Sequence, residues 1–583
     1  MNYFSDEKEW TWLFKNGMDW ETIIPLYYNS FPTEDGLNSK EEVLQFFEEL
    51  MDTTGNWCGT SVADRAGKLD DDGAGTISNG KTIPSEALAQ LYQEAKELQL
   101  YGISLPTKYG GMGVPASLHM IVLGQLSRAC VASSTQLAFF TSIGEMVHRF
   151  CDEETANRLV PMIVAGDISG SMCLTEPGCG SDLGLIRTSA APQADGSYLV
   201  NGSKIFITNG GGGIHFTLAR INGAPEGLDG ISMFLIEQDL GDGKNNFEVV
   251  KNEDKMGMHG SFTTEILYEN SKAHLVGNKG EGFKMMLHLM NEARIAVGMQ
   301  SLGVIEASIG YAVEYAKERQ QFGKPISELP LMKRLLNDYT TERDAIRALL
   351  VDTISHYDIF QKLELKHSET GDLSKEEQNL LEEAKLWTRK RTPLVKYYAC
   401  ETAVTLSQRA IQVLGGYGFM HEYPVERFHR DSFGPLLYEG TSQIQALMAL
   451  KDVVKYAIKD PKRFFQNVLF KHPGADLLSG SEEWAKEFKS THYRFKKKML
   501  SLLISSLKPA GSKVFNAKSW QSEEGVDKLM IHAETLAQAL SYLETLRVLC
   551  EHANKDKARA DLFFRYKKLV TPRLEAIYTD WSA

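Results

Sequence analysis

At 583 residues, with 43% hydrophobic and 24% charged residues, the chain has the composition of a globular protein with about three or four structural units. Its net charge of -13 argues against a nucleic-acid binder that works through a general positive field. Seven scattered cysteines without a CxxC pair indicate neither a disulfide framework nor a cysteine zinc site, so we expect a reducing, cytoplasmic compartment and assign no metal ligands.

The N-terminus is acidic and aromatic, unlike a secretory signal. The sequence contains no run of 18 apolar residues, so we expect no membrane span. Residues 1–165 show apolar positions at helical spacing, as in Val43, Phe46 and Phe47. Within this region the glycines and aspartates of 53–76 predict a long loop between helices. We therefore expect an N-terminal helical domain.

Residues 166–280 change to a period of two, in segments such as SYLVNGSKIFITN and GISMFLIEQD, which predicts a β domain. Helical spacing returns over 281–457, where a long apolar stripe that starts at Met285 indicates a helix packed in a bundle. The helical period also predicts an additional helical segment over residues 458–583. The order predicts an α+β multidomain protein.

The additional segment contains FKSTHYRFKKKMLSLLISSL, in which a basic run, Lys496 to Lys498, adjoins an apolar face. This pattern is typical of a bundle helix or of a membrane-surface helix. We favour the bundle helix, because most amphipathic helices of globular proteins face a core.

The most distinctive segment is MCLTEPGCGSDLG, residues 172–184, in which a strand is followed by a proline turn and two spaced glycines. Glycines let a backbone approach a ligand closely, and exposed amides suit a pyrophosphate or the polar edge of a ring. An ordinary β-turn remains the alternative for this segment alone.

Three further segments follow in order: KIFITNGGGG, ERQQFGKPI and QVLGGYGFMHEYPVERFHRD. In the second, Arg319 could pair with a phosphate while Phe322 packs against a flat base. Taken singly, each segment is best explained as a helix end or loop. Near the end of the bundle region, PLLYEGTSQIQ places Glu439 after an apolar run, as a turn residue or as an acid in an apolar pocket.

Together, CLTEPGCGSD, KIFITNGG, RQQFGKPI, LGGYGF and YEGTSQIQ resemble the signatures of the acyl-CoA dehydrogenase family, in the family's order, over roughly residues 40–457. The resemblance implies an N-terminal helical domain, a middle β-barrel and a C-terminal four-helix bundle, with FAD between the last two. It also implies an acyl-CoA substrate and an electron-transfer flavoprotein as acceptor, as in fatty-acid β-oxidation.

The resemblance further implies a set of FAD contacts. Leu174 and Thr175 would meet the polar edge of the flavin, Gly180 and Ser181 the pyrophosphate, and Phe206 and Thr208 the ring. A second group would reach the adenosine diphosphate end of FAD in a neighbouring subunit, and two more residues would complete the site. These are Arg319, Phe322, Gln412, Gly415 and Gly416, followed by Thr441 and Gln443.

At the family's catalytic-base position stands Glu439, which would remove the substrate's α-proton while the β-hydrogen leaves as hydride to the flavin, the cofactor that supplies the redox chemistry. Apolar neighbours would disfavour its charged form and strengthen it as a base. Its backbone N–H would bind the thioester carbonyl. The implied substrate contacts are Ser181, Asn291, Arg294, Tyr438 and Gly440.

Some members carry the base on another helix, directly before an arginine, but here that position is Ala293. The adjacent Glu292 is turned away by about 100° on a helix, and we expect it to be a solvated carboxylate or one near a helix N-terminus.

Ala446 replaces an arginine that many members carry, and with the C-terminal extension it resembles the larger members, which include 3-methylmercaptopropionyl-CoA dehydrogenase. Those members tend to be homodimers. Two alternatives remain: an acyl-CoA oxidase, although its usual TELGHG-type segment is TEPGCG here, and a DNA- or partner-binding flavoprotein, which only the basic run supports.

Overall fold

The computed structural model describes residues 1–33, 36–459, 480–507 and 523–582, and the chain forms two compact units. Unit 1 comprises residues 1–6 and 27–304, and unit 2 comprises residues 7–26 and 305–583. The first two helices therefore group with the C-terminal half of the chain rather than with the helices that follow them.

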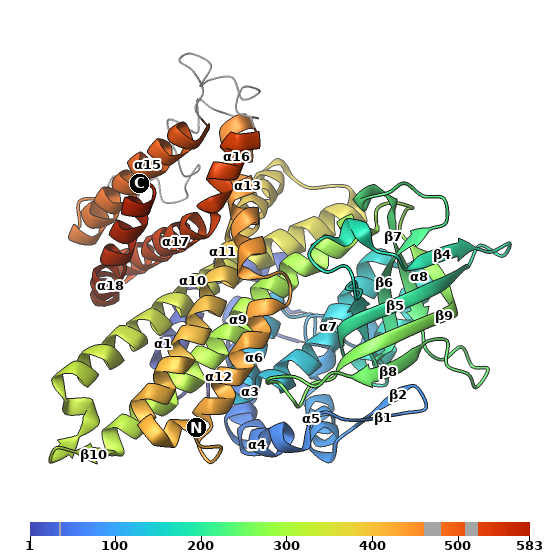
Figure 1. The fold of residues 1–583 in the computed structure, drawn as a ribbon, viewed down its shortest axis with the longest axis horizontal. Coiled ribbons are helices and arrows are strands. Elements are labelled where there is room, and N and C mark those ends of the chain that lie inside the picture. The colour runs from blue at the N-terminus through green and yellow to red at the C-terminus, as the bar shows by residue number, and fades with distance from the viewer. Residues whose placement is uncertain (34–35, 460–479, 508–522, 583) are drawn as a thin grey trace. The chain divides into compact units, whose positions relative to one another are not determined.

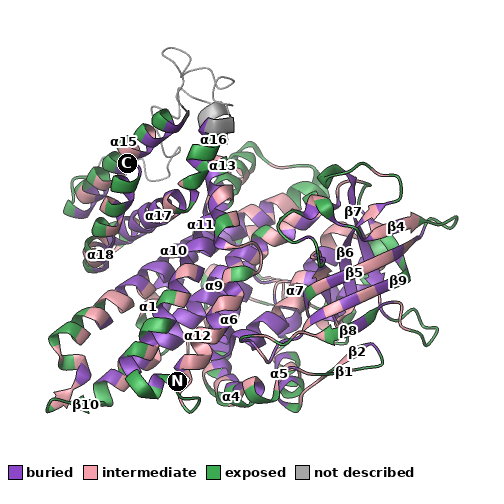
Figure 2. Ribbon diagram, in the orientation of Figure 1, coloured by how far each residue is buried: buried purple, intermediate pink, exposed green. Residues whose placement is uncertain are grey.

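The N-terminal part of unit 1 is helical, as predicted. Its helices are α3 (Lys40–Trp57), α4 (Ala63–Asp72), α5 (Glu86–Glu97), α6 (Ala116–Ala129), α7 (Val131–Phe150) and α8 (Glu153–Val164), with a hairpin of β1 (Gly75–Ser78) and β2 (Lys81–Pro84). Ser39, Ser85 and Asp152 each cap a helix by accepting a backbone N–H with the side chain. Every residue of α6 is buried, so it lies at the centre of this layer (Figure 2).

The prediction of a long loop over 53–76 is wrong. The chain continues from α3 through a π-helical turn, Cys58–Val62, into α4, and only residues 73–74 separate α4 from β1. A Cβ at Gly55 would lie 2.5 Å from Asn2 Oδ1, and one at Gly59 would lie 1.9 Å from Met1 O. These glycines allow the N-terminal residues to cross the helix closely, a use that local sequence does not distinguish from a turn.

The second part of unit 1 is a closed β-barrel, as predicted (Figure 1). Its strands are β3 (Ser169–Cys173), β4 (Ser189–Pro192), β5 (Tyr198–Thr208), β6 (Gly213–Ile221), β7 (Ile231–Glu237), β8 (Glu248–Asn252) and β9 (Thr263–Val276). The order β6–β4–β5–β9–β7 closes because β7 pairs again with β6, while β3 and β8 add to the outside of this ring. Val200, Phe234 and Ile266 belong to its buried core, which explains the period of two.

Unit 2 is built on long helices, which Figure 1 shows running alongside one another. They are α10 (Pro330–Thr370), α11 (Lys375–Leu414), α12 (Val425–Leu437) and α13 (Ser442–Lys459), together with α9 (Gly282–Glu318), which begins in unit 1 and ends in unit 2. A capping box between Ser374 and Glu377 starts α11. A short hairpin of β10 (Gln320–Gln321) and β11 (Lys324–Pro325) follows α9.

The described part of the C-terminal extension, residues 480–507 and 523–582, adds four helices to unit 2. These are α15 (Glu483–Leu507), α16 (Glu523–Ile531), α17 (Ala533–Lys555) and α18 (Ala560–Asp580), and α17 packs on α10, α11 and α13. The apolar face of α15 is buried, including Phe488, Phe495 and Met499. The basic run on α15 therefore belongs to a bundle helix, the interpretation favoured from the sequence.

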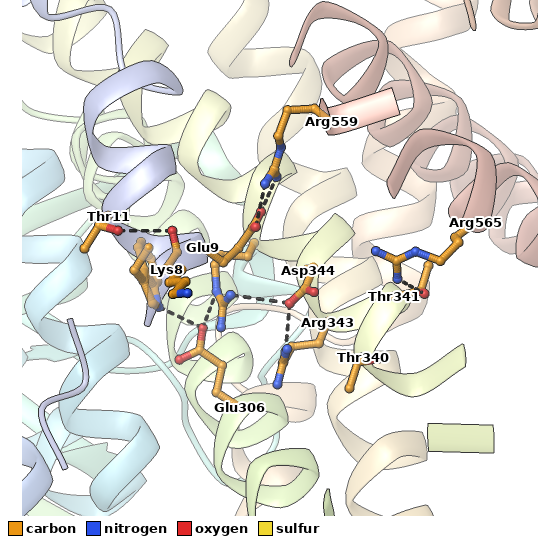
Figure 3. Close-up of polar contacts among 12 residues, drawn as sticks. Lys8, Glu9, Thr11, Glu306, Thr340, Thr341, Arg343, Asp344, Arg559 and Arg565 are labelled. Atoms are coloured by element: carbon orange, nitrogen blue, oxygen red, sulfur yellow. Dashed lines mark hydrogen bonds and ion pairs between the residues drawn. The ribbon is translucent and has the colours of Figure 1, made fainter. Parts of the chain in front are cut away.

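The N-terminal helix α1 (Lys8–Asn16) is fastened to the extension within unit 2 (Figure 3). Both carboxylate oxygens of Glu9 accept hydrogen bonds from the guanidinium of Arg559, which also lies 4.2 Å from the ring centroid of Trp12. On the neighbouring helix α10, Arg347 donates to Glu306 at 2.7 Å. The Glu9–Arg559 pair explains why α1 clusters with a segment more than 500 residues away, since the two residues are 550 positions apart.

Helix α9 has the length and mean hydropathy of a membrane-crossing helix, but 83% of its most apolar window is buried inside the protein. Among the described residues no other helix passes that test. A helix buried to this extent is a core helix of the protein. The apolar stripe that starts at Met285 is the surface of α9 that this burial covers.

Candidate active site

The loop after β3 is fastened to β5 at the point where the predicted flavin contacts lie. Leu174 and Thr175 follow β3 directly, and their carbonyl oxygens accept hydrogen bonds from Lys204 Nζ and from the backbone N–H of Ile205, each at 2.9 Å. Phe206 is the next residue along β5. Two segments about 30 positions apart in the sequence are thereby brought together, as the resemblance implies.

A buried ion pair stabilises this loop. The side chain of Lys204 is fully buried and donates to Glu176 Oε1 at 2.8 Å, while Thr188 Oγ1 donates to the same oxygen at 2.6 Å. Burial raises the pKa of Glu176, but the charge of Lys204 and the hydrogen bonds from Lys204 and Thr188 outweigh it, so this pKa lies below 4.5. The loop thus contains a carboxylate that is charged at neutral pH.

The outer surface of the loop is open for a ligand. Gly180 and Ser181 are exposed, and a Cβ at Gly180 would meet no atom closer than 3.8 Å. Phe206 is 61% exposed and has a φ of 59°. An exposed aromatic ring beside uncrowded backbone suits a flat heterocycle and a pyrophosphate, so this part of unit 1 fits the flavin end of FAD.

Unit 2 holds a cavity of about 510 Å³ that gathers the residues assigned to the adenosine diphosphate end of FAD. Arg319, Gln412, Gly415 and Gly416 all line it. The Arg319 guanidinium lies 5.4 Å from the ring centroid of Tyr417, and a Cβ at either glycine would meet no atom within 4 Å. A cation beside open glycine backbone is suited to a phosphate group, so the cavity fits this part of the cofactor.

Phe322 lies outside that lining set, in the hairpin between β10 and β11, where it is 88% exposed and has a φ of 53°. In the isolated chain this ring contributes an exposed apolar surface, and Phe419, which follows the same glycine segment, is 79% exposed. Exposed aromatic rings are typical of a surface that a ligand or a second subunit covers.

The predicted base lies in a turn between two helices. Helix α12 ends at Leu437, α13 begins at Ser442, and Glu439 is half-buried between them. Its φ is 58°, and that of Gly440 is 95°. Both sequence alternatives contained part of the answer, since Glu439 is a turn residue and is also partly withdrawn from water.

Left-handed backbone concentrates at the predicted site. Among the described residues, those other than glycine with positive φ are Asn79, Gln99, Phe206, Asn209, Met258, Asn270, Phe322 and Glu439. Asparagine adopts this conformation readily, whereas each other residue type costs about 1–2 kcal/mol there. Three of the remaining five are predicted site residues, and such strain persists where the surrounding structure imposes it at a functional position.

The other residues around the turn have defined surroundings. Thr441 is half-buried, and the exposed Gln443 donates its side-chain amide to Glu534 of α17 at 2.6 Å. A predicted cofactor contact is therefore in direct contact with the C-terminal extension.

The predicted substrate contacts on α9 interact with each other. Arg294 Nη1 donates to Asn291 Oδ1 at 2.9 Å, and Arg294 is only 3% exposed. The expectation that Glu292 is a solvated or N-terminal helix carboxylate is wrong, because its side chain is buried at 7% exposure and α9 begins well before it, at Gly282. Glu292 therefore remains a candidate that an experiment must separate from Glu439.

The sequence analysis assigned no role to the residues that hold these turns, although Glu176, Lys204 and Gln445 lie inside the quoted motifs. Lys204 and Glu176 secure the loop after β3, and Lys396 and Gln445 bind the carbonyls around Glu439. The available signal was weak: Lys396 is a charged residue inside the apolar helical stretch LVKYYAC. No group of three or more metal-ligating side chains occurs in the part of the chain that the structure describes.

Comparison with known proteins agrees with the predicted order of the domains. Three family models match in order: the acyl-CoA dehydrogenase N-terminal domain over residues 47–167, the middle domain over 171–271 and the C-terminal domain over 280–454. The chain is similar to an acyl-CoA dehydrogenase of Bacillus subtilis, with 35% identity over 62% of this chain and 89% of that protein.

A longer relative extends further along the chain. 3-Methylmercaptopropionyl-CoA dehydrogenase of Ruegeria pomeroyi is 30% identical over 72% of this chain and 73% of its own. A solved acyl-CoA dehydrogenase of Bacillus anthracis complexed with FAD has the same fold, with a TM-score of 0.74, 23% identity, and coverage of 92% of this chain and 88% of that one.

Proposed function

The chain belongs to the acyl-CoA dehydrogenase family and is an FAD-dependent oxidoreductase, and from this premise we propose that Glu439 is the base that removes the α-proton of its acyl-CoA substrate. The product would be the trans-2-enoyl-CoA. The observation that carries the proposal is the strained, half-buried position of Glu439 in the turn between α12 and α13.

When bound, FAD supplies the acceptor for the hydride that leaves the β-carbon. The residues of unit 1 that would hold it are Leu174, Thr175, Ser181 and Phe206, and those of unit 2 include Arg319. Each group fits the part of the cofactor assigned to it, by exposed backbone and an aromatic ring in unit 1 and by a cation beside open glycines in unit 2.

The chemical work of the protein is to acidify and remove a proton. A carboxylate that is partly withdrawn from water has its charged form disfavoured. The pKa of its acid form therefore rises towards that of the substrate's α-carbon, which makes the proton transfer less unfavourable. The backbone N–H of Glu439 would donate to the thioester carbonyl, whose negative charge grows as the proton leaves. The Glu439 carboxylate would then hold the α-proton on one oxygen.

The test compares two glutamates in one assay. The variants Glu439→Gln and Glu292→Gln are purified with FAD, and flavin bleaching is followed anaerobically across acyl-CoAs from C4 to C16 and 3-methylmercaptopropionyl-CoA. Loss of a general base lowers rates by about 10²–10⁴-fold, so E439Q should retain its yellow colour and lose bleaching by that factor. E292Q should bleach within about threefold of wild type.

The opposite pattern would transfer the role of base to Glu292. If neither variant lost bleaching, proton abstraction by Glu439 or by Glu292 would be refuted. The same panel identifies the acyl chain, which the proposal leaves open because pocket depth depends on packed side chains rather than on a motif.

We also propose that the electrons leave to an electron-transfer flavoprotein, as the family resemblance implies, and that the enzyme acts in a cytoplasmic β-oxidation step. The segment TEPGCG in place of TELGHG favours this acceptor over oxygen. Reduced enzyme should reoxidise quickly with an electron-transfer flavoprotein and slowly in air. Rapid reoxidation in air with production of hydrogen peroxide would instead identify an acyl-CoA oxidase.

We further propose a homodimer in which the cavity around Arg319 receives the adenosine diphosphate end of the partner's FAD. The exposed Phe322 and Phe419 support this, because a second subunit would cover them. Light scattering of the holoprotein should give twice the chain mass, and Phe322→Asp should give monomers that lose FAD. A monomeric wild-type holoprotein would contradict the proposal.

A further inference from the structure

The turn that carries Glu439 adopts a conformation that its own sequence does not favour. Glu439 and Gly440 have successive positive φ values of 58° and 95°. A Cβ at Gly440 would lie 2.9 Å from Gln445 Nε2, so the turn is also tightly packed. A left-handed residue other than glycine persists only where the surrounding structure holds it. The direction of the Glu439 side chain therefore depends on the groups that fix this turn.

A single buried lysine connects the two ends of the turn. Lys396 lies on α11 with a fully buried side chain, and its Nζ donates to the carbonyl oxygens of Leu436 at 2.9 Å and Gly440 at 2.8 Å. These two residues bracket Glu439. The carbonyls at the C-terminal end of α12 have no partner within that helix and carry partial negative charge, so an ammonium is well suited to this position.

Other buried groups complete the frame around the turn. Gln445 Nε2 donates to the carbonyl oxygens of Glu439 at 3.0 Å and Gly440 at 3.1 Å. Cys400 follows Lys396 by one helical turn of α11, and its Sγ donates to Pro435 O at 3.3 Å. Helix α11 thus presents a row of donors to the end of α12, and Lys396 is the charged member of that row.

We propose that Lys396 is a positioning residue for proton abstraction: by binding both ends of the turn, it fixes the left-handed conformation in which Glu439 meets the substrate. The inference rests on the proposed function, since it requires Glu439 to be the base. A lysine in this interior position is costly to bury, and an apolar side chain would serve packing between α11 and α12 equally well. Its two bonds to the turn account for the charged side chain.

The experiment separates positioning from general stability. Lys396→Met keeps the length of the side chain and removes its donors, whereas Lys396→Arg keeps the charge and the donors. Lys390→Met is the matched control, because Lys390 is a largely buried lysine on the same helix that lines a small cavity among α11, α13 and α17, away from the turn. Glu439→Gln is measured alongside.

Four quantities are measured for each protein: FAD content, the melting temperature, the dissociation constant of the acyl-CoA that bleaches wild type fastest, and the first-order rate constant of anaerobic bleaching. A fifth is exchange of the substrate's α-hydrogen for deuterium in D₂O, which reports proton abstraction without electron transfer. A displacement of about 1 Å costs roughly 100-fold in rate, so K396M should lose about that much bleaching and α-exchange. FAD content and substrate affinity should stay within twofold.

K396R should recover at least tenfold of the loss, and K390M should bleach at the wild-type rate even where its melting temperature falls. The inference is overturned if K396M bleaches within threefold of wild type, or if K390M loses as much rate for the same loss of melting temperature. If K396M does not fold, Lys396→Gln is measured in its place. Its bleaching and α-exchange rates should fall by about tenfold.

The E439Q measurement distinguishes the two failures. If E439Q still bleaches and exchanges at the wild-type rate, the proposed base is wrong and the role of Lys396 falls with it. If E439Q loses both activities while K396M retains them, the base stands and only the positioning role is refuted.

Discussion

The loop after β3 in unit 1 and the turn between α12 and α13 in unit 2 are each fastened by a buried lysine, but with different partners. Lys204 donates to the carbonyl of Leu174 and to the carboxylate of Glu176. Lys396 donates to two backbone carbonyls. The Lys204 ammonium is paired with the negative charge of Glu176, whereas the two carbonyls that Lys396 binds belong to the backbone around Glu439. We therefore expect removal of Lys204 to act mainly on stability and removal of Lys396 mainly on rate.

The largest expected effect is that of Lys204→Met. Breaking a buried ion pair by removing one partner leaves a buried charge and costs about 3–5 kcal/mol, so the free energy of unfolding in urea should fall by that amount. The double variant K204M/E176Q should recover part of the loss. Lys251→Met, at an exposed lysine of the same barrel that pairs with Glu253, should change little. A K204M protein as stable as wild type would refute the expectation that Lys204 acts mainly on stability and Lys396 mainly on rate.

Two glycines sharpen the same comparison. Gly440 has a φ of 95° and a crowded Cβ position, whereas Gly180 has open space around it. Gly440→Ala should lower bleaching by about 10–100-fold and stability by about 1–2 kcal/mol, since both strain and position change. Gly180→Ala should leave the apoprotein within about 0.5 kcal/mol of wild type and weaken only FAD binding. Urea unfolding of apoprotein, FAD titration and bleaching measure these quantities.

If G180A destabilised the apoprotein as much as G440A, the loop after β3 would not have free space for a side chain at Gly180. If G440A bleached at the wild-type rate, the turn would tolerate distortion, and proton abstraction would not require the left-handed conformation of Glu439.

Acid tests the ion pair of Lys204 through its carboxylate partner, Glu176. The pKa of Glu176 is lower in the folded protein than its ordinary 4.5, so the unfolded chain takes up this proton at a higher pH. Its contribution to stability is therefore complete above about pH 5 and is lost as the pH falls through the lowered value. Urea unfolding between pH 6 and pH 3 should show a steeper loss for wild type than for E176Q.

K396M leaves the Lys204–Glu176 pair intact, so it should keep the part of the acid dependence that Glu176 contributes. An unchanged acid dependence in E176Q would show that other carboxylates account for the loss in this range.

The smallest expected effect is that of Cys400→Ala. Its Sγ donates a weak hydrogen bond to Pro435 O at 3.3 Å, one helical turn from Lys396. We expect less than about 1 kcal/mol of stability and less than a twofold change in bleaching. A larger change in bleaching would distribute the positioning role along the whole face of α11 instead of assigning it to Lys396.

The parts of the fold that were predicted from the sequence are those with a regular period. The strand pattern around Lys204 and Phe206 predicted β5, and the stripe from Met285 predicted α9. The failures have a tertiary cause. Residues 53–76 contain turn-forming glycines that are instead used for close helix crossing. Glu292 resembles a surface carboxylate in the sequence, and only the packing of α9 buries it.

By itself the sequence determined which residue types stand at the site: Glu439 after an apolar run, glycines at the cofactor segments, and the order of the motifs that identifies the family. Those features are local, because a peptide's own side chains and backbone freedom define them. Only the tertiary structure decided what holds them in place. Lys396 binds carbonyls 40 and 44 positions further along the chain, and Lys204 a carboxylate 28 positions before it. Buried donors are matched to acceptors across helices and strands, and a linear pattern does not encode that pairing.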